Sequence, residues 1–160
     1  MKVLDSTGYD VGPLVQDTAA EYGMPVVGLL ALLKAESDLN PTAERWGTWP
    51  DVSFGLGQTT VQLAASYGIG DGTPASAETV RQALFDRATA VRLAADYYRF
   101  GLHIAEGADP SLEGDDWLLA GMVVYNSGGY QEPGNWYWQR FADRIQRYRD
   151  ALAWAHTAVG

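Results

Sequence analysis

The strongest constraint on the fold is a series of apolar residues at helical spacing that ends in a glutamate. Glu36 continues a row of apolar residues that recur at helical spacing, namely Val26, Leu29, Leu30 and Leu33. Ionising a carboxyl on an apolar row is unfavourable, and the negative end of the helix dipole adds to this effect. We therefore expect a raised pKa for Glu36, which suits a general acid near neutral pH. The plain alternative is a frayed helix end with Glu36 in water.

The periodicity along the chain predicts an all-α or nearly all-α domain of six to eight helices. The residue before a proline avoids the helical region, so Asn40-Pro41 is expected to end the helix that starts at Pro25. Further helices are predicted over 11–22, from Thr59 or Thr60 to 67, over 76–85, 87–106, from Asp115 or Asp116 to 125, and from Asn135 to 156. The expected N-caps are Thr59 or Thr60, Asp86, Asp115 or Asp116, and Asn135. No strand longer than four residues is evident, and a short hairpin within 43–54 is left open.

Length and charge narrow the classes of function. With 160 residues, 47% of them hydrophobic, the chain suits a single domain over 1–160 with a proper core. The net charge of −9 argues against nucleic acid as a partner, because no basic surface is available to meet phosphates. The same charge argues against electrostatic capture by anionic lipid or cell wall. An anionic substrate would then have to be bound by shape, stacking and hydrogen bonds.

Residue types that are rare or absent exclude other chemistry. The chain has no cysteine, which removes disulfides, thiolate metal sites and a cysteine nucleophile. Its two histidines, His103 and His156, are far apart in the sequence. We therefore expect no metal and no cofactor. The first residues lack the apolar run of a signal peptide, and no stretch suits a membrane span, so neither export by such a signal nor membrane insertion is expected.

The long irregular segment over 38–58 holds several candidate site residues, since loops of this length are usually functional when they are rich in aromatic residues. Asp51 is a candidate second carboxylate that would hold a water or steady positive charge across a cleft, or else a turn residue after Pro50. In Gly55-Leu56-Gly57-Gln58, the glycines allow close backbone approach to a ligand and Gln58 offers both a donor and an acceptor. The same tetrapeptide also fits a plain turn before a helix.

Two further groups of residues are candidates for a binding cleft. Tyr125-Asn126 closes an apolar helix, where Tyr125 is otherwise a core residue and Asn126 a helix C-cap. Tryptophan faces can stack on sugar rings, and the tryptophans in or near loops are the better candidates for a cleft wall: Trp46, Trp49, Trp136 and Trp138. Trp117 and Trp154 lie within helical patterns and are expected in the core. The arginines at 140, 144 and 147 are expected to form a solvated helix face with Asp143 and Asp150.

These motifs, taken in order, resemble the lysozyme-like lytic transglycosylase family, which includes the soluble lytic transglycosylases and is related to goose-type lysozymes. The resemblance covers roughly residues 11 to 150. It rests on Glu36-Ser37 followed by Asn40-Pro41 and Ala43, on Ser53-Phe54-Gly55-Leu56-Gly57-Gln58, on a helix around 88–98, and on Ala120-Gly121-Met122-Val123-Val124-Tyr125-Asn126-Ser127-Gly128.

The resemblance implies a lysozyme-like fold around a glycan cleft and an enzyme that cuts peptidoglycan. The bond is the β-1,4 linkage between N-acetylmuramic acid and N-acetylglucosamine, and Glu36 would protonate the leaving oxygen. By the same resemblance, Gln58 would contact a saccharide ring, Tyr125 would hydrogen-bond near the acid, and Asn126 would shape the cleft. Ser53 and Gly55 belong to the same substrate-binding motif.

The chain departs from the family pattern at three points. Gly57 stands where methionine is usual, Arg45-Trp46-Gly47 stands where a small residue and a serine are common, and Asp51 occupies a loop position where goose-type lysozymes carry a carboxylate. Two routes therefore stay open. In lytic transglycosylation, Glu36 alone acts as acid and then as base on the 6-hydroxyl of the sugar, which closes a 1,6-anhydro ring. In hydrolysis, Asp51 would handle a water, and its presence slightly favours this route.

Two rival functions remain at this stage. One is an inverting chitosanase or chitinase of the lysozyme superfamily, because negative protein charge suits cationic chitosan. The other is a module that grips glycan without cutting it, although a relative of that kind would be expected to lose the acid. The resemblance and the missing signal peptide together fit a bacteriophage lysin, virion-associated or released at lysis, that acts on bacterial cell wall as a monomer with peptidoglycan strands as its partner.

Overall fold

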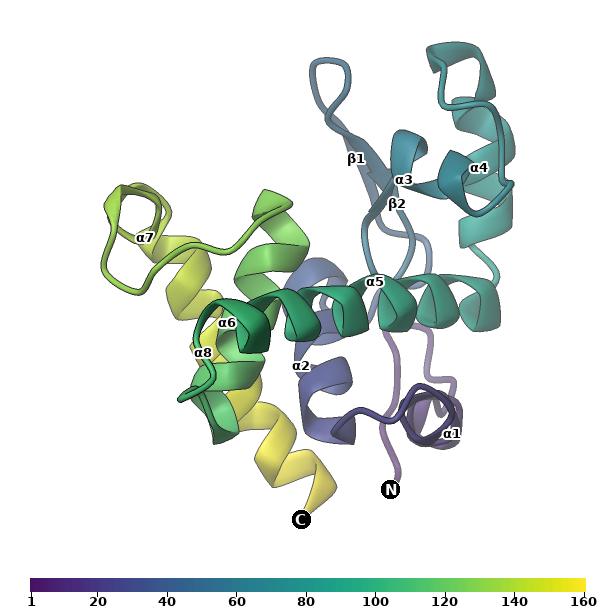
Figure 1. Ribbon diagram of the computed structural model, residues 1–160. Helices are drawn as coiled ribbons and strands as arrows, with labels where there is room; N and C mark the ends of the chain where they lie inside the picture. Colours follow the sequence, from purple (N-terminus) through teal and green to yellow (C-terminus); the bar gives the residue numbers. More distant parts are fainter.

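The computed structural model describes all 160 residues and is arranged around α2 (Val26–Ser37), a helix that is apolar on nearly every side. A helix of this kind is stable in water only when other elements surround it. Four helices pack around α2: α1 (Gly12–Glu21), α5 (Arg87–Ala108), α6 (Gly114–Ser127) and α8 (Ala142–Val159). They enclose the main core of 30 buried residues, with α2 near the middle of the molecule (Figure 1).

A smaller part of the fold is built on a three-stranded antiparallel sheet. Its strands are β1 (Glu44–Trp46), β2 (Val52–Phe54) and β3 (Thr59–Thr60), in that spatial order, so the hairpin left open for 43–54 is present. A separate cluster of seven buried residues joins β2 to α3 (Val61–Ser66) and α4 (Ala77–Leu84), with a 3₁₀ turn over Pro74–Ser76. Figure 1 shows the hairpin, α3 and α4 on one side of α5, with α6, α7 (Trp136–Arg140) and α8 toward the other end of that helix.

The expectation of a nearly all-α chain with six to eight helices is confirmed, since the structure has eight α-helices and only short strands. Three expected N-caps are present as well. The Thr60 side chain accepts a hydrogen bond from the Leu63 amide, the Asp86 carboxylate from the Thr89 amide, and the Asn135 side chain from the two amides at 137 and 138. These short polar side chains satisfy helix amides that otherwise have no partner.

Three details of the helices differ from the expectation. The chain leaves α2 at Asp38, where Asp38 and Leu39 are both left-handed, so the helix ends before Asn40-Pro41 can act. Neither Asp115 nor Asp116 caps α6, because that helix already begins at Gly114, after Glu113. The last predicted helix is broken at Phe141, which separates α7 from α8.

The N-terminal segment is fastened to the start of α5 through Asp5, whose side chain is fully buried. Its carboxylate accepts hydrogen bonds from the Thr7 amide (2.8 Å), the Thr7 hydroxyl (2.7 Å) and the Tyr9 amide (3.0 Å), and Arg87 Nε binds it at 2.6 Å. Burial by itself would raise the pKa of Asp5, but these hydrogen bonds outweigh burial and lower the pKa to about 2. No helix in the structure has both the length and the apolar character that crossing a membrane requires.

Candidate active site

Glu36 lies in the last turn of α2, half-buried, at a cavity of about 530 Å³. The cavity is bounded by the end of α2, by the chain around β1, and by one face of α8. Its lining includes, besides Glu36, the residues Ala43, Gln58, Arg147, Asp150 and Trp154. The end of α2 therefore places Glu36 at a cavity that is large enough for a ligand.

The Glu36 carboxyl has one direct partner, the phenol of Tyr148. Tyr148 Oη donates to Glu36 Oε1 at 2.7 Å, and the Tyr148 side chain is buried in α8. Burial raises the pKa of Glu36, while the Tyr148 hydrogen bond and the more distant charges of Arg144 and Arg147 offset part of that rise. The expectation of a raised pKa is confirmed in direction, with burial as its main cause.

The turn after α2 fixes the rim of this cavity. The Lys34 ammonium pairs with the Asp38 carboxylate and also lies 5.0 Å from the centre of the Trp154 ring. Trp154 is half-buried: it packs against the main core, as expected, and it also lines the cavity. Its indole therefore adds an aromatic surface to the cavity wall.

Gln58 borders both the Glu36 cavity and a second cavity of about 280 Å³. Its side-chain amide donates to Ala43 O (3.2 Å) and Gly55 O (3.0 Å), and it accepts from Ser53 Oγ (3.1 Å). The buried Ser53 therefore orients Gln58 and does not itself line either cavity. Gly55 has φ +75°, and a side chain there would meet Leu84 O at 2.3 Å, so this turn requires glycine.

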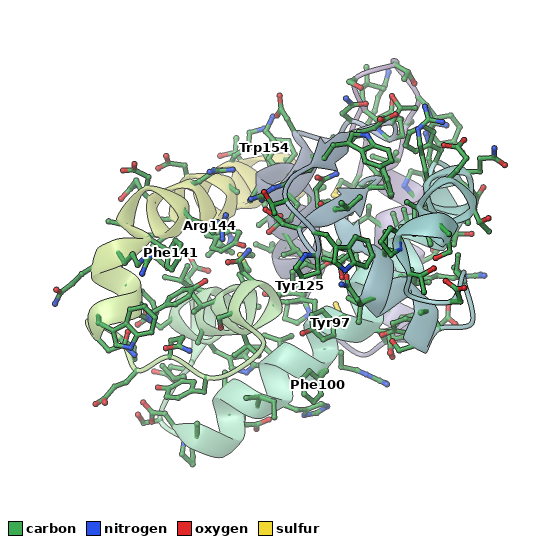
Figure 2. The ribbon with its side chains drawn as sticks, turned by 90° about the horizontal axis from the view of Figure 1, so that it is seen from above. Tyr97, Phe100, Tyr125, Phe141, Arg144 and Trp154 are labelled. Atoms are coloured by element: carbon green, nitrogen blue, oxygen red, sulfur yellow. The ribbon has the colours of Figure 1, made fainter.

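Tyr125 lines the second cavity and closes the turn around Gly57. Its hydroxyl donates to Gly57 O at 2.7 Å, so the hydroxyl bonded to the acid belongs to Tyr148 and not to Tyr125. The centre of the Tyr125 ring lies 5.1 Å from that of the Tyr97 ring, and Figure 2 shows the two residues side by side. A Cβ at Gly57 would lie 2.6 Å from the Ala94 Cβ and 3.1 Å from Tyr125 Oη, so these two side chains leave no room for a larger residue.

Asn126 connects the end of α6 to α7 and α8. Its side-chain oxygen accepts hydrogen bonds from Tyr137 Oη (2.7 Å) and from the Arg144 guanidinium. Arg144 is half-buried and turned inward, so it does not belong to the expected solvated face, whereas Arg140 and Arg147 are exposed as expected. Asn126 and its neighbours at 127 and 128 line the second cavity next to Tyr125.

The other predicted site residues do not line either cavity. Asp51 lies in the hairpin turn, where its carboxylate pairs with Arg45 Nη2 at 2.8 Å, and both side chains are about half exposed. Trp46 and Trp49 of the hairpin and Trp136 of α7 are 58%, 38% and 64% exposed. Trp138 is half-buried, with its indole N–H bonded to Gln131 O. The structure thus brings Glu36, Gln58, Tyr125 and Asn126 to the cavities and leaves Asp51 and these tryptophans outside them.

Sequence reasoning missed the contribution of α8 to the site. Arg147, Asp150, Ala151 and Trp154 recur at helical spacing and share the face that lines the Glu36 cavity, and Tyr148 lies on the adjoining buried face. The spacing is visible in the sequence as one row. What the sequence did not reveal is that α8 packs against α2 and brings this row to Glu36.

The arrangement has the parts of a proton donor. A carboxyl whose pKa is raised by burial, which is positioned by a phenol and opens on a cavity, is suited to transfer a proton to a bound group. The structure has no cluster of three or more His, Cys, Asp or Glu side chains arranged to hold a metal ion.

Comparisons with known proteins identify no relative of this chain. No family model, no curated protein and no solved structure matches it significantly.

Proposed function

We propose that the protein is a glycosidase with a lysozyme-like fold that cleaves the β-1,4 bond between N-acetylmuramic acid and N-acetylglucosamine in peptidoglycan. The observation that carries this proposal is Glu36, a carboxyl with a raised pKa at a cavity of about 530 Å³. The order of the motifs supports it, because the Glu36, Gln58 and Tyr125-Asn126 segments come together along the two adjoining cavities.

In the proposed reaction, Glu36 donates its proton to the glycosidic oxygen as that bond breaks. Tyr148 fixes the carboxyl through its 2.7 Å hydrogen bond and stabilises the carboxylate that forms once the proton has left. Gln58 is held rigid by three hydrogen bonds, so it can present a fixed edge to the saccharide between the two cavities.

The structure favours lytic transglycosylation over hydrolysis as the route, and so reverses the slight preference drawn from the presence of Asp51. Asp51 is paired with Arg45 outside the cavity, where it is not placed to handle a water. The other carboxylates that line the cavity already have partners: Asp38 with Lys34, Glu44 with Arg81, and Asp150 with Gln146. Glu36 is left as the carboxyl available for both proton steps, and transglycosylation requires no second one.

The test is mass spectrometry of the fragments that purified peptidoglycan releases with the protein. We expect fragments with 1,6-anhydro ends, one water lighter than hydrolysis products, and no fragments with Glu36→Gln. Reducing ends would contradict the transglycosylase route, and Asp51→Asn and Asp150→Asn would then identify the residue that handles water. Release from chitosan but not from cell wall would favour a chitosanase, and glycan binding without any fragments would favour a non-catalytic module.

The setting of this activity is part of the same proposal. A peptidoglycan-cleaving domain of this size fits a bacteriophage lysin that reaches the bacterial cell wall from the virion or at lysis. We expect it to act on glycan strands as a monomer. Clearing of a cell-wall suspension, followed by turbidity, together with sedimentation of the free protein, tests both statements.

A further inference from the structure

Two arginines of α8 act on Glu36 through their charge and have no carboxylate partner: the half-buried Arg144, which lines neither cavity, and the exposed Arg147. Arg144 and Arg147 are three residues apart, so their side chains project from one face of the helix. Arg147 lines the Glu36 cavity, while Arg144 is half-buried and bonded to the neutral amide of Asn126, which lines the second cavity. None of the ion pairs in the structure includes either residue.

The other charges at the Glu36 cavity are largely compensated. Lys34 pairs with Asp38, and Glu44 pairs with Arg81 at 2.7 Å. Asp150 also lines the cavity and accepts a hydrogen bond from Gln146, with no cation within ion-pair distance. The carboxyl of Glu36 is engaged by Tyr148. Near Glu36, the charges without an ion-pair partner are therefore the two guanidinium groups and the Asp150 carboxylate, which leaves a local excess of one positive charge in a protein of net charge −9.

The Arg144 guanidinium contacts the Asn126 amide oxygen, the neighbouring Tyr137 hydroxyl and the Phe141 ring at 5.6 Å, all of them uncharged groups, and it has N–H donors left over. Arg carries five N–H groups in a planar fork that matches the two oxygens of a carboxylate. Figure 2 shows Arg144 on α8, turned toward the side on which Tyr125 and Tyr97 lie. A ligand that follows the cleft past Glu36 would pass this face of α8.

We infer that Arg144 and Arg147 form an anion-binding edge that takes a carboxylate carried by the sugar next to the scissile bond. The inference rests on the proposed function and names the ligand class more narrowly: a strand whose N-acetylmuramic acid units carry a free carboxylate, as opposed to units whose carboxyl is amide-linked to a stem peptide, to neutral chitin or to cationic chitosan. The edge supplies locally the attraction for an anionic polymer that the net charge of the whole protein opposes.

The experiment compares two glycans of equal length on a Glu36→Gln background, which removes turnover and leaves binding. One is a tetrasaccharide of alternating N-acetylglucosamine and N-acetylmuramic acid, and the other is neutral chitotetraose. Titration calorimetry measures Kd for each glycan with Arg147→Gln or Arg144→Gln added. The matched control is Arg149→Gln, which removes the same charge from an exposed position outside both cavities.

We expect Arg147→Gln and Arg144→Gln to weaken binding of the acidic tetrasaccharide about tenfold each, as loss of a hydrogen bond to a charged group does. Binding of chitotetraose should change less than twofold in the same variants, and Arg149→Gln should change neither. Because Arg144 also holds Asn126, Arg144→Lys serves as a second variant that keeps the charge, and it should retain part of the preference. Melting temperatures exclude unfolding as the cause.

Equal weakening of both glycans would overturn the inference, because it would show a structural role only. A second outcome would also overturn it. The arginine variants would keep the preference for the acidic glycan, but the same substitutions in protein that retains Glu36 would shift the pH profile of turnover. The arginines would then act on Glu36 alone. The proposed function can fail separately: an arginine-dependent preference in binding, with no fragments released by the native protein, would support the edge and refute the glycosidase. Failure to bind either glycan would overturn the inference whatever the activity.

Discussion

The carboxyl groups of the buried Asp5 and the half-buried Glu36 have pKa values shifted in opposite directions. Asp5 is surrounded by four donors, of which Arg87 is charged, and its pKa falls to about 2. Glu36 has the single donor Tyr148, its cations are more distant, and its pKa is raised. Burial pushes both groups the same way, so the number and charge of the close donors decide the sign.

The two groups differ in their roles: the Asp5 carboxylate stabilises the fold, whereas the Glu36 carboxyl is available for chemistry. The oxygens of Asp5 are bound by groups from the N-terminal segment and from α5, so the ionised form is part of the structure. Glu36 has a single hydrogen-bond donor and a raised pKa, so its charged form is less favoured than that of Asp5, and it opens on a cavity. A proton donor requires this second condition, because it must hold a proton near neutral pH and release it on demand.

The largest expected effect is on turnover, and it should be confined to one of the two groups. Glu36→Gln should lower kcat on peptidoglycan roughly a hundred- to ten-thousandfold, the range that general acid catalysis contributes. Asp5→Asn makes the same chemical change, carboxyl to amide, and should leave kcat within about twofold in folded protein. Turbidity clearing at pH 7 measures both. Comparable loss in both variants would mean that Glu36 has no special role.

The next largest effect is on the free energy of unfolding, and here substitution of Asp5 should matter more than substitution of Glu36. Asp5→Asn should lower the free energy of unfolding by roughly 2 to 3 kcal/mol, because it leaves the Arg87 guanidinium without its carboxylate. Glu36→Gln should leave stability unchanged or increase it, since the amide keeps the Tyr148 hydrogen bond and carries no charge to bury. Urea denaturation at pH 7 compares the two. A strongly destabilised Glu36→Gln variant would show that Glu36 is an anion that the fold depends on.

A smaller effect tests the one donor that Glu36 has. Tyr148→Phe removes a hydrogen bond that favours the carboxylate, so the pKa of Glu36 should rise further and the alkaline limb of the pH–rate profile should move to higher pH. Turnover should fall about tenfold, which corresponds to roughly 1.4 kcal/mol of lost positioning. Tyr98→Phe is the control, because it removes another buried phenol bond, to Leu118 O at 2.9 Å. An identical pH profile in both variants would exclude a role for Tyr148 in holding the acid.

Local signals in the sequence were enough for most of the helices and for the candidate acid. Apolar periodicity located α2 and its terminal Glu36, and short polar residues marked the N-caps at Thr60, Asp86 and Asn135. These features depend on residues within one or two turns of each other. The sequence within each segment is therefore sufficient to predict these helices and their N-caps.

The residues around the acid could not be predicted in the same way. Tyr148 is 112 residues from Glu36, and its role depends on how α8 packs against α2, which no local pattern specifies. Asp51 has the right residue type, but the hairpin turn directs it to Arg45 and away from the cavity. Net charge is limited for a related reason: it is an average over the surface and does not show where individual arginines such as Arg144 and Arg147 lie.

The smallest expected effect is also the closest test of the comparison, because it concerns only the sign of a pH dependence. Asp5 has a lowered pKa, so its contribution to stability is complete above about pH 4 and is lost as pH falls toward 2. The deficit of Asp5→Asn relative to native protein should therefore shrink on acidification below pH 4.

Glu36 has a raised pKa, so the unfolded chain loses the proton first and native stability declines as pH rises above about 4.5. The advantage of Glu36→Gln should accordingly be absent at pH 4 and grow with pH, until the folded protein also ionises. Urea titrations from pH 3 to 8 give both curves, and curves of the same sign would refute the assignment of opposite shifts.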